Sequence, residues 1–176
     1  MTFWQVSLLV AVALSAAQAC HEHPECSPRQ DHPECLPLWS RYGANCYRFF
    51  GQTKTWQAAE EHCRQFFSQS GQGHLVSIHS RDEDVLLRIL SRSSIAAADV
   101  SVWFGATDEE VETEYRWSDG TEWDYQNWLP NEPNNMNSRR QQEHCLTLRF
   151  YNNQVGWNDG VCGNQYAFIC KMPASQ

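Results

Sequence analysis

The sequence lacks an excess of basic side chains, and this argues against a nucleic-acid-binding domain. Lys and Arg together number 13 against 21 Asp and Glu, which gives a formal net charge of −8 over 176 residues. Nucleic acid would require a basic face on the protein. The chain also has no long run of like charge and no low-complexity tract. After removal of a leader, its length suits one compact domain with a short extension.

The chain begins with an apolar run that is too short to cross a membrane. The run extends from Val6 to Ala17, whereas a transmembrane helix needs about 20 residues. Gln18 and Ala19 complete an A-x-A cleavage pattern, although no Lys or Arg precedes the run. We predict that residues 1–19 are a signal peptide cleaved before Cys20, so that the protein is secreted, is extracellular and has no membrane span.

No nucleophile motif accompanies the histidines that follow. His62, His74 and His79 are scattered among apolar neighbours, and none has a serine-acid or cysteine-acid partner at a recognisable spacing. We interpret them as packing or capping residues.

Oxygen-bearing side chains are concentrated in the C-terminal third of the chain. They are Glu132, Asn134, Glu143, Asn158 and Asp159. Calcium takes about six to eight oxygen ligands from carboxylates, amides, backbone carbonyls and water. Acid-Pro-Asn alone is ordinary turn chemistry, but the whole set predicts a calcium site. Paired carboxylates also form glycosidase sites; here they alternate with amides, which suits holding a cation, and we expect no enzymatic activity.

Together with the cysteines, Glu132-Pro133-Asn134, the later Glu143 and Trp157-Asn158-Asp159 resemble the sugar-binding calcium site of the C-type lectins. The resemblance covers roughly residues 35–171. It implies an α+β fold with two helices, small antiparallel sheets and a long irregular calcium-binding loop region, in a domain of residues 35–172. It also implies a set of calcium ligands: Glu132, Asn134, Glu143, Asn158 and Asp159. All of these except Asp159 would also contact the sugar.

The order of the triplet indicates a sugar class. In this family, Glu-Pro-Asn resembles members that select mannose, N-acetylglucosamine or fucose, whereas Gln-Pro-Asp accompanies galactose. The resemblance therefore implies a secreted, mannose-type lectin, similar to small invertebrate lectins that agglutinate cells or act in innate immunity. Its partners would be glycans on cell or microbial surfaces. The alternative is a protein-, ice- or mineral-binding module, because one fold serves several functions.

The family often carries a second, auxiliary calcium ion near the first. Asp108 and Glu112 match two of its acidic ligands, but Asn135 and His144 stand where acids are expected. Because two carboxylates are missing from an all-oxygen site, we predict a weak second calcium site at best.

All eight cysteines follow residue 19, which suits disulfides in an oxidising compartment. Spacing alone leaves on the order of a hundred pairings open. The resemblance implies three pairs: Cys35 with Cys46, Cys63 with Cys170, and Cys145 with Cys162.

Cys20 and Cys26 remain, in an extension of residues 20–34 that contains His-Pro-Glu-Cys twice. A metal site built from His21, His23 and His32 with the thiols is conceivable, but disulfides are the favoured fate in a secreted protein. Our hypothesis is that one or both cysteines form interchain bonds in a disulfide-linked homo-oligomer.

Two helices are predicted within the domain. Thr55 can cap the first, in which Trp56, Ala59, Cys63 and Phe66 form one buried face. Ser80 and Glu83 form a capping box at the start of the second, where each satisfies the other's free backbone N–H group. An apolar face is expected on this second helix from four residues: Val85, Leu86, Ile89 and Leu90.

Overall fold

A computed structural model describes residues 35–95, 99–135 and 141–175. These residues all belong to the compact unit of residues 33–176. The predicted signal peptide, the extension of residues 20–34 and the proposed interchain cysteines Cys20 and Cys26 lie outside the described residues.

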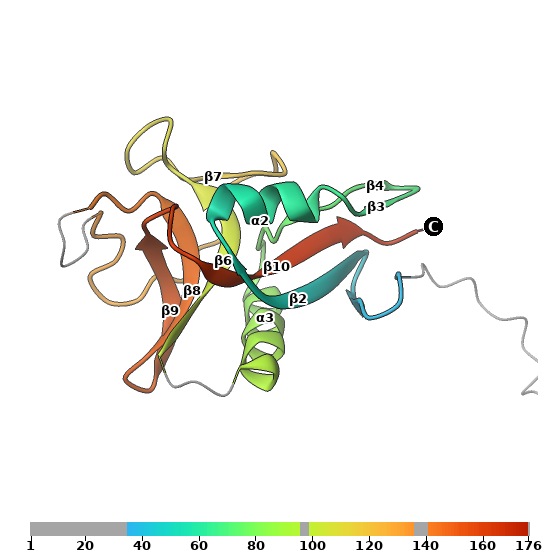
Figure 1. The fold of residues 1–176 in the computed structure, drawn as a ribbon, viewed down its shortest axis with the longest axis horizontal. Helices are drawn as coiled ribbons and strands as arrows, with labels where there is room; N and C mark the ends of the chain where they lie inside the picture. Colours follow the sequence, from blue (N-terminus) through green and yellow to red (C-terminus); the bar gives the residue numbers. More distant parts are fainter. Residues whose placement is uncertain (1–34, 96–98, 136–140, 176) are drawn as a thin grey trace, which may run out of the picture. The chain divides into compact units, whose positions relative to one another are not determined.

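Two helices and ten strands make up the described chain (Figure 1). In chain order they are β1 Ser40–Tyr42, β2 Asn45–Lys54, α2 Trp56–Cys63, β3 Phe67–Ser68, β4 Gly71–Gln72, β5 His74–Leu75, α3 Arg81–Ser94, β6 Val100–Thr107, β7 Arg116–Trp117, β8 Cys145–Tyr151, β9 Gln154–Gly160 and β10 Tyr166–Pro173. The α+β fold class is confirmed. Within the described ranges, no helix is both long and apolar enough to span a bilayer.

Most strands join one sheet rather than several small ones. Its order is β1-β2-β10-β6-β8-β9, with β5 added to β10 and β7 added to β6. The β10–β6 pair is parallel and the other pairs of this sheet are antiparallel. A separate two-stranded sheet contains β3 and β4. β8 and β9 lie together at one end of the order (Figure 1), with β9 as the edge strand and β8 between it and β6.

The first helix starts where its local sequence predicts. Thr55 accepts a hydrogen bond from the backbone N–H of Ala58, and Trp56, Ala59 and Cys63 are buried. The helix ends at Cys63, so Phe66 lies beyond it. Phe66 still packs against the core through Trp39, with ring centroids 5.1 Å apart.

The second helix departs from two predictions. Ser80 accepts from the backbone N–H of Glu83, as expected, but the Glu83 carboxylate accepts from the backbone N–H of His79 at 2.8 Å rather than from Ser80. Its expected apolar face is wrong in part: Val85 and Ile89 are exposed by 43% and 60%, while Leu87 is fully buried. The positions of the apolar residues alone therefore do not predict which face of this helix is buried.

Three disulfides tie the fold together, and they are the pairs that the family resemblance implies. They join Cys35 to Cys46, Cys63 to Cys170 and Cys145 to Cys162. The second closes a separation of 107 residues. In the chain-entropy model a bridge over about 100 residues contributes up to about 4.7 kcal/mol, so this bond restrains the unfolded chain most.

The long segment between β7 and β8 is held by aromatic packing on a buried tryptophan. Trp157 of β9 is fully buried and contacts the rings of Trp117, Trp123 and Trp128. Its backbone N–H donates to the carbonyl of Asn127, and its carbonyl accepts from Leu129, both at 2.8 Å. The segment that carries the predicted triplet is thereby fixed to β9.

Candidate functional site

The β8–β9 hairpin presents two of the predicted ligands. Leu146 pairs with Asp159 and Thr147 pairs with Asn158 across the two strands. Asn152 and Asn153 form the turn with φ angles of 48° and 61°, a conformation that Asn tolerates and that suits a two-residue hairpin. This register buries Asp159 completely and leaves Asn158 6% exposed.

The loop that carries the triplet is attached to Asp159. The two carboxylate oxygens of Asp159 accept from the backbone N–H groups of Asn134 at 3.2 Å and Asn135 at 2.5 Å. The Glu132–Pro133 bond within this loop is cis. Asp159 therefore positions the triplet as well as contributing a negative charge.

Glu143 approaches the same place from the segment just before β8. Its backbone N–H donates to the side-chain oxygen of Asn135 at 3.2 Å, and the residue is 9% exposed. The structure thus brings together residues of the triplet loop, of the segment before β8 and of β9 that are up to 25 positions apart in sequence, because Asp159 accepts from the backbone N–H of Asn134.

The three carboxylates carry more negative charge than their surroundings compensate. Burial, a hydrogen bond with Asp159 and the charges of Asp159 and Glu143 raise the pKa of Glu132 to about 7. Burial and the charge of Asp159 raise the pKa of Glu143 to about 7 as well. Oε2 of Glu132 is buried and has no hydrogen-bond partner among the described residues. This donor set fits a hard divalent cation such as calcium.

A cavity of about 640 Å³ opens beside these carboxylates. Asn134, Glu143 and Asn158 line it, together with Arg149 of β8, whose Nη1 lies 3.3 Å from Oδ1 of Asn158. Carboxylate oxygens can accept hydrogen bonds and amides can both donate and accept. The cavity can therefore bind a ligand rich in hydroxyl groups.

The residues of the predicted second site also meet. Asp108 and Glu112 lie close to His144, with one ligand atom from each within 4.8 Å of the others. Among the described residues one other such trio exists, Glu109 with Cys145 and Cys162. The carboxylates of Glu132, Glu143 and Asp159 do not form so tight a group.

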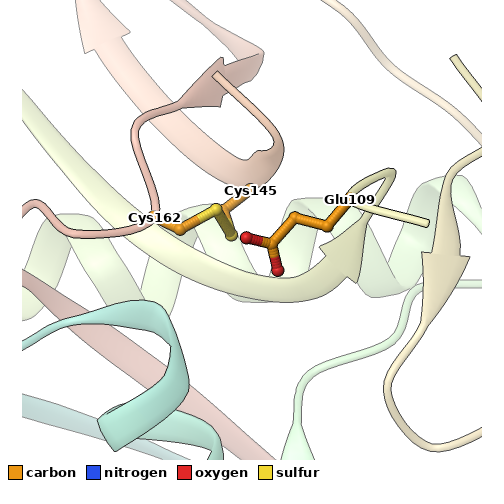
Figure 2. Close-up of side chains that lie close together, drawn as sticks. All are labelled: Glu109, Cys145 and Cys162. Carbon is orange, nitrogen blue, oxygen red and sulfur yellow. A yellow bond between two sulfur atoms is a disulfide. The ribbon is translucent and has the colours of Figure 1, made fainter. Parts of the chain in front are cut away.

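The trio around Glu109 is not a metal site. Figure 2 shows the Glu109 carboxylate pointing toward the sulfur atoms of Cys145 and Cys162, which are joined in a disulfide. Cysteine binds a metal ion as the thiolate, and sulfur in a disulfide has no thiolate form. Glu109 therefore adds no site.

Two residues with a bearing on the site escaped the sequence reasoning. Arg149 follows Thr147 by two positions on β8, and both line the cavity. Because side chains two positions apart in a strand lie on one face, the sequence could have indicated Arg149. Asp84 of α3 accepts from the indole N–H of Trp157 at 2.9 Å. No local sequence pattern indicates this role of Asp84, because Trp157 is 73 residues away.

Comparison with known proteins agrees with the fold. The family model for the Lectin C-type domain matches residues 52–172. An alpha-N-acetylgalactosamine-specific lectin of Patiria pectinifera is 35% identical over 98% of both chains. The C-type lectin CEL-I of Cucumaria echinata is 28% identical with a TM-score of 0.71, over 78% of this chain and 96% of that one.

Another solved structure with a similar fold is that of an antifreeze protein. A calcium-independent type II antifreeze protein is 29% identical with a TM-score of 0.66, over 83% of this chain and 99% of that chain. The fold and the oxygen-rich site define a lectin-like binding domain. On the family match and the relative of equal length, the chain belongs to the C-type lectin domain family.

Proposed function

We propose that the protein is a secreted, calcium-dependent lectin that prefers mannose, N-acetylglucosamine or fucose, and that it binds these sugars without catalysis. The observation that carries this proposal is the convergence of Glu132, Glu143 and Asp159 with a buried carboxylate oxygen that has no hydrogen-bond partner. Such a group is costly in a folded protein unless a cation compensates it. Calcium fits because the remaining donors are amide oxygens.

The side chains around the cavity have the chemistry that a sugar needs. Glu143, Asn134 and Asn158 line it, so a carboxylate can accept from a sugar hydroxyl while amide N–H groups donate to it. Bound calcium would neutralise the carboxylates and coordinate two neighbouring hydroxyls directly. Asp159 is fully buried, and its part is to hold the ion and the loop.

The order of the triplet favours mannose-type sugars over galactose-type sugars. Glu132 precedes Asn134, which in the family resemblance goes with mannose, N-acetylglucosamine or fucose. The relative from Patiria pectinifera is described as specific for alpha-N-acetylgalactosamine, so the galactose type is the competing specificity. The antifreeze neighbour makes ice the competing ligand class.

Binding to immobilised mannan tests the proposal. We expect retention in calcium buffer, complete loss in EDTA and recovery when calcium is restored. Free mannose should elute the protein at lower concentration than N-acetylgalactosamine. Retention that is unchanged in EDTA would contradict the role of calcium. Elution by N-acetylgalactosamine at a lower concentration than mannose would contradict the sugar class. Ice binding without mannan binding would favour an ice-binding module.

Association of several copies would suit a recognition role. A single shallow sugar site binds weakly, whereas linked copies raise avidity by about 10²–10⁴ when both sites can engage. The proposal assigns this linkage to Cys20 or Cys26, in the extension of residues 20–34 that follows the signal peptide. Glycans on cell or microbial surfaces, which repeat the same sugar, would be the partners.

Calcium stabilisation should depend on pH between about 4.5 and 7. The pKa of Glu132 and of Glu143 is about 7 in the folded protein against an ordinary 4.5, so the folded state binds more protons than the unfolded state in this window. Without calcium, the free energy of unfolding therefore falls as pH rises through it. Protons compete with the cation, so the gain in Tm on adding calcium should shrink from pH 8 to pH 5.

Calorimetric scans with and without calcium across this range measure the effect. Glu132→Gln should reduce the calcium gain at every pH, whereas Glu114→Gln, at a carboxylate 62% exposed, should leave the profile unchanged. A gain in Tm that stays constant from pH 8 to pH 5 would contradict the prediction.

A further inference from the structure

His144 is directed at two carboxylates at once. Its Nδ1 lies 2.9 Å from Oδ1 of Asp108 and 3.8 Å from Oε2 of Glu112. We propose that Asp108, Glu112 and His144 form a second metal site that takes a transition-type divalent ion of the Zn²⁺ class in place of calcium. This site is separate from the five-residue calcium group, and the inference does not rest on sugar binding.

Hydrogen bonding alone does not account for the arrangement. One ring nitrogen carries at most one hydrogen, so it can satisfy one of the two carboxylates and leaves the other facing a like charge. Asp108 is 2% exposed, and its second oxygen already accepts from the backbone N–H of Thr113 at 2.8 Å. A cation between the three groups would compensate both carboxylates.

The pair of His74 and Glu60 shows what a completed structural pair looks like in this protein. His74 Nδ1 lies 2.7 Å from Oε1 of Glu60, and the side chain of His74 is 21% exposed, as is that of His144. The other Glu60 oxygen accepts from the backbone N–H of Leu75 and the hydroxyl of Ser118. Both Glu60 oxygens are therefore occupied, as are both oxygens of Asp108. The two pairs differ in that no second carboxylate faces the His74 ring nitrogen within 4 Å.

A buried hydroxyl beside the trio gives a second, independent indication of a missing cation. Tyr115 is 6% exposed, and its hydroxyl has no hydrogen-bond partner in the described part of the chain. Burial and then the charges of Asp108, Asp159, Glu112 and Glu132 raise its pKa. The unpartnered hydroxyl thus lies in the negative field of Asp108 and Glu112 as well as in that of the five-residue calcium group.

The imidazole determines the class of ion. Calcium takes oxygen ligands, whereas imidazole suits zinc and its neighbours, which accept mixed nitrogen and carboxylate ligands. Zinc ligands at about 2.0–2.2 Å in a tetrahedron lie about 3.3–3.6 Å apart. The observed 2.9 and 3.8 Å bracket this separation. Three protein ligands leave the fourth position to water or to a further donor.

The backbone already holds two of the three ligands in place. The N–H of Asp108 donates to the carbonyl of His144 at 3.1 Å, and Thr107 pairs with Cys145 between β6 and β8. Asp108 therefore directly follows β6 and His144 directly precedes the antiparallel β8, while Glu112 comes from the loop after β6 and its side chain is half-exposed. Ion binding would open the contact between His144 and Asp108 from 2.9 Å by roughly half an ångström and bring Glu112 closer than 3.8 Å by a few tenths.

Zinc and cobalt titrations of the full chain test this site. His21, His23 and His32 are replaced by Asn in every sample so that the N-terminal extension does not compete, and calcium is kept saturating so that the five-residue group is occupied. We expect one Zn²⁺ per chain by calorimetry. Co²⁺ should give a visible d–d absorption band, which Zn²⁺ then displaces.

Single substitutions in that background identify the ligands. His144→Ala should weaken Zn²⁺ binding by at least about tenfold and remove the Co²⁺ band. His144→Asp should weaken Zn²⁺ likewise but add a calcium ion, because it restores an all-oxygen site. His74→Ala is the matched control and should change neither. Should His144→Ala fail to fold, Glu112→Gln, at a half-exposed side chain, is expected to show the same loss of zinc.

Three outcomes would overturn the proposal. They are zinc binding that survives both His144→Ala and Glu112→Gln, an equal loss in His74→Ala, and zinc uptake that is seen only when calcium is absent. The last would place the ion in the five-residue group. None of these results depends on mannan retention, so failure here and failure of the lectin proposal can be told apart.

Discussion

Replacing Asp159 by Asn is expected to abolish calcium binding and, with it, retention on mannan. Asp159 is fully buried, and both of its carboxylate oxygens accept backbone N–H groups of the triplet loop. The amide of Asn would turn one acceptor into a donor that faces another donor. It would also remove one of the three negative charges that attract the ion.

The expected magnitude is a calcium dissociation constant raised by at least about 100-fold, since calcium affinity varies over several decades with the charge and rigidity of the ligand set. Calorimetric titration with calcium measures it directly. Asp99→Asn is the matched control, because Asp99 lines the same cavity but its side chain is 62% exposed. Equal calcium affinity in the two variants would remove Asp159 from the site.

Features that depend on neighbours in sequence could be predicted well. Thr55 and Ser80 cap their helices because a short side-chain oxygen three residues before a free N–H group needs no distant partner. The pairing of the cysteines came from the family resemblance, since spacing alone could not choose among the alternatives.

Features that depend on distant partners were missed or were wrong in part. Glu83 does not close the predicted capping box, because its carboxylate also accepts from the hydroxyl of Tyr47 and from Lys171, 88 residues away. The buried face of α3 includes Glu83 and Asp84. Hydrophobic periodicity cannot assign charged residues to a core when their partners come from other parts of the chain.

In the site, too, local motifs could be predicted and contacts between distant residues could not. Five oxygen donors could be named from the motif, and the structure brings their loop, strand and hairpin together through Asp159. His144 was interpreted as the loss of an acid from a calcium site. Its position between Asp108 and Glu112 depends on the register of β6 and β8, which the sequence pattern alone does not specify.

Asp84→Ala should destabilise the protein by about 3–5 kcal/mol, the range for removing one partner of a buried charged network. Asp84 is 1% exposed. It accepts from the indole N–H of Trp157 at 2.9 Å and from the amide of Asn127 at 2.8 Å. Nε of Arg88 lies 2.7 Å away without hydrogen-bond geometry, so we count this contact as an ion pair only. Alanine leaves both hydrogen-bond donors without this acceptor and removes the charge that pairs with Arg88.

Urea unfolding measures this loss, and Asp82→Ala on the same helix is the control. Asp82 is exposed, so its removal should change the free energy of unfolding by no more than about 0.5 kcal/mol. Because Trp157 precedes Asn158, and Asn127 lies in the segment that leads to the triplet, Asp84→Ala should also weaken calcium binding although Asp84 is not a ligand. A variant as stable as Asp82→Ala would show that α3 does not anchor the binding loop.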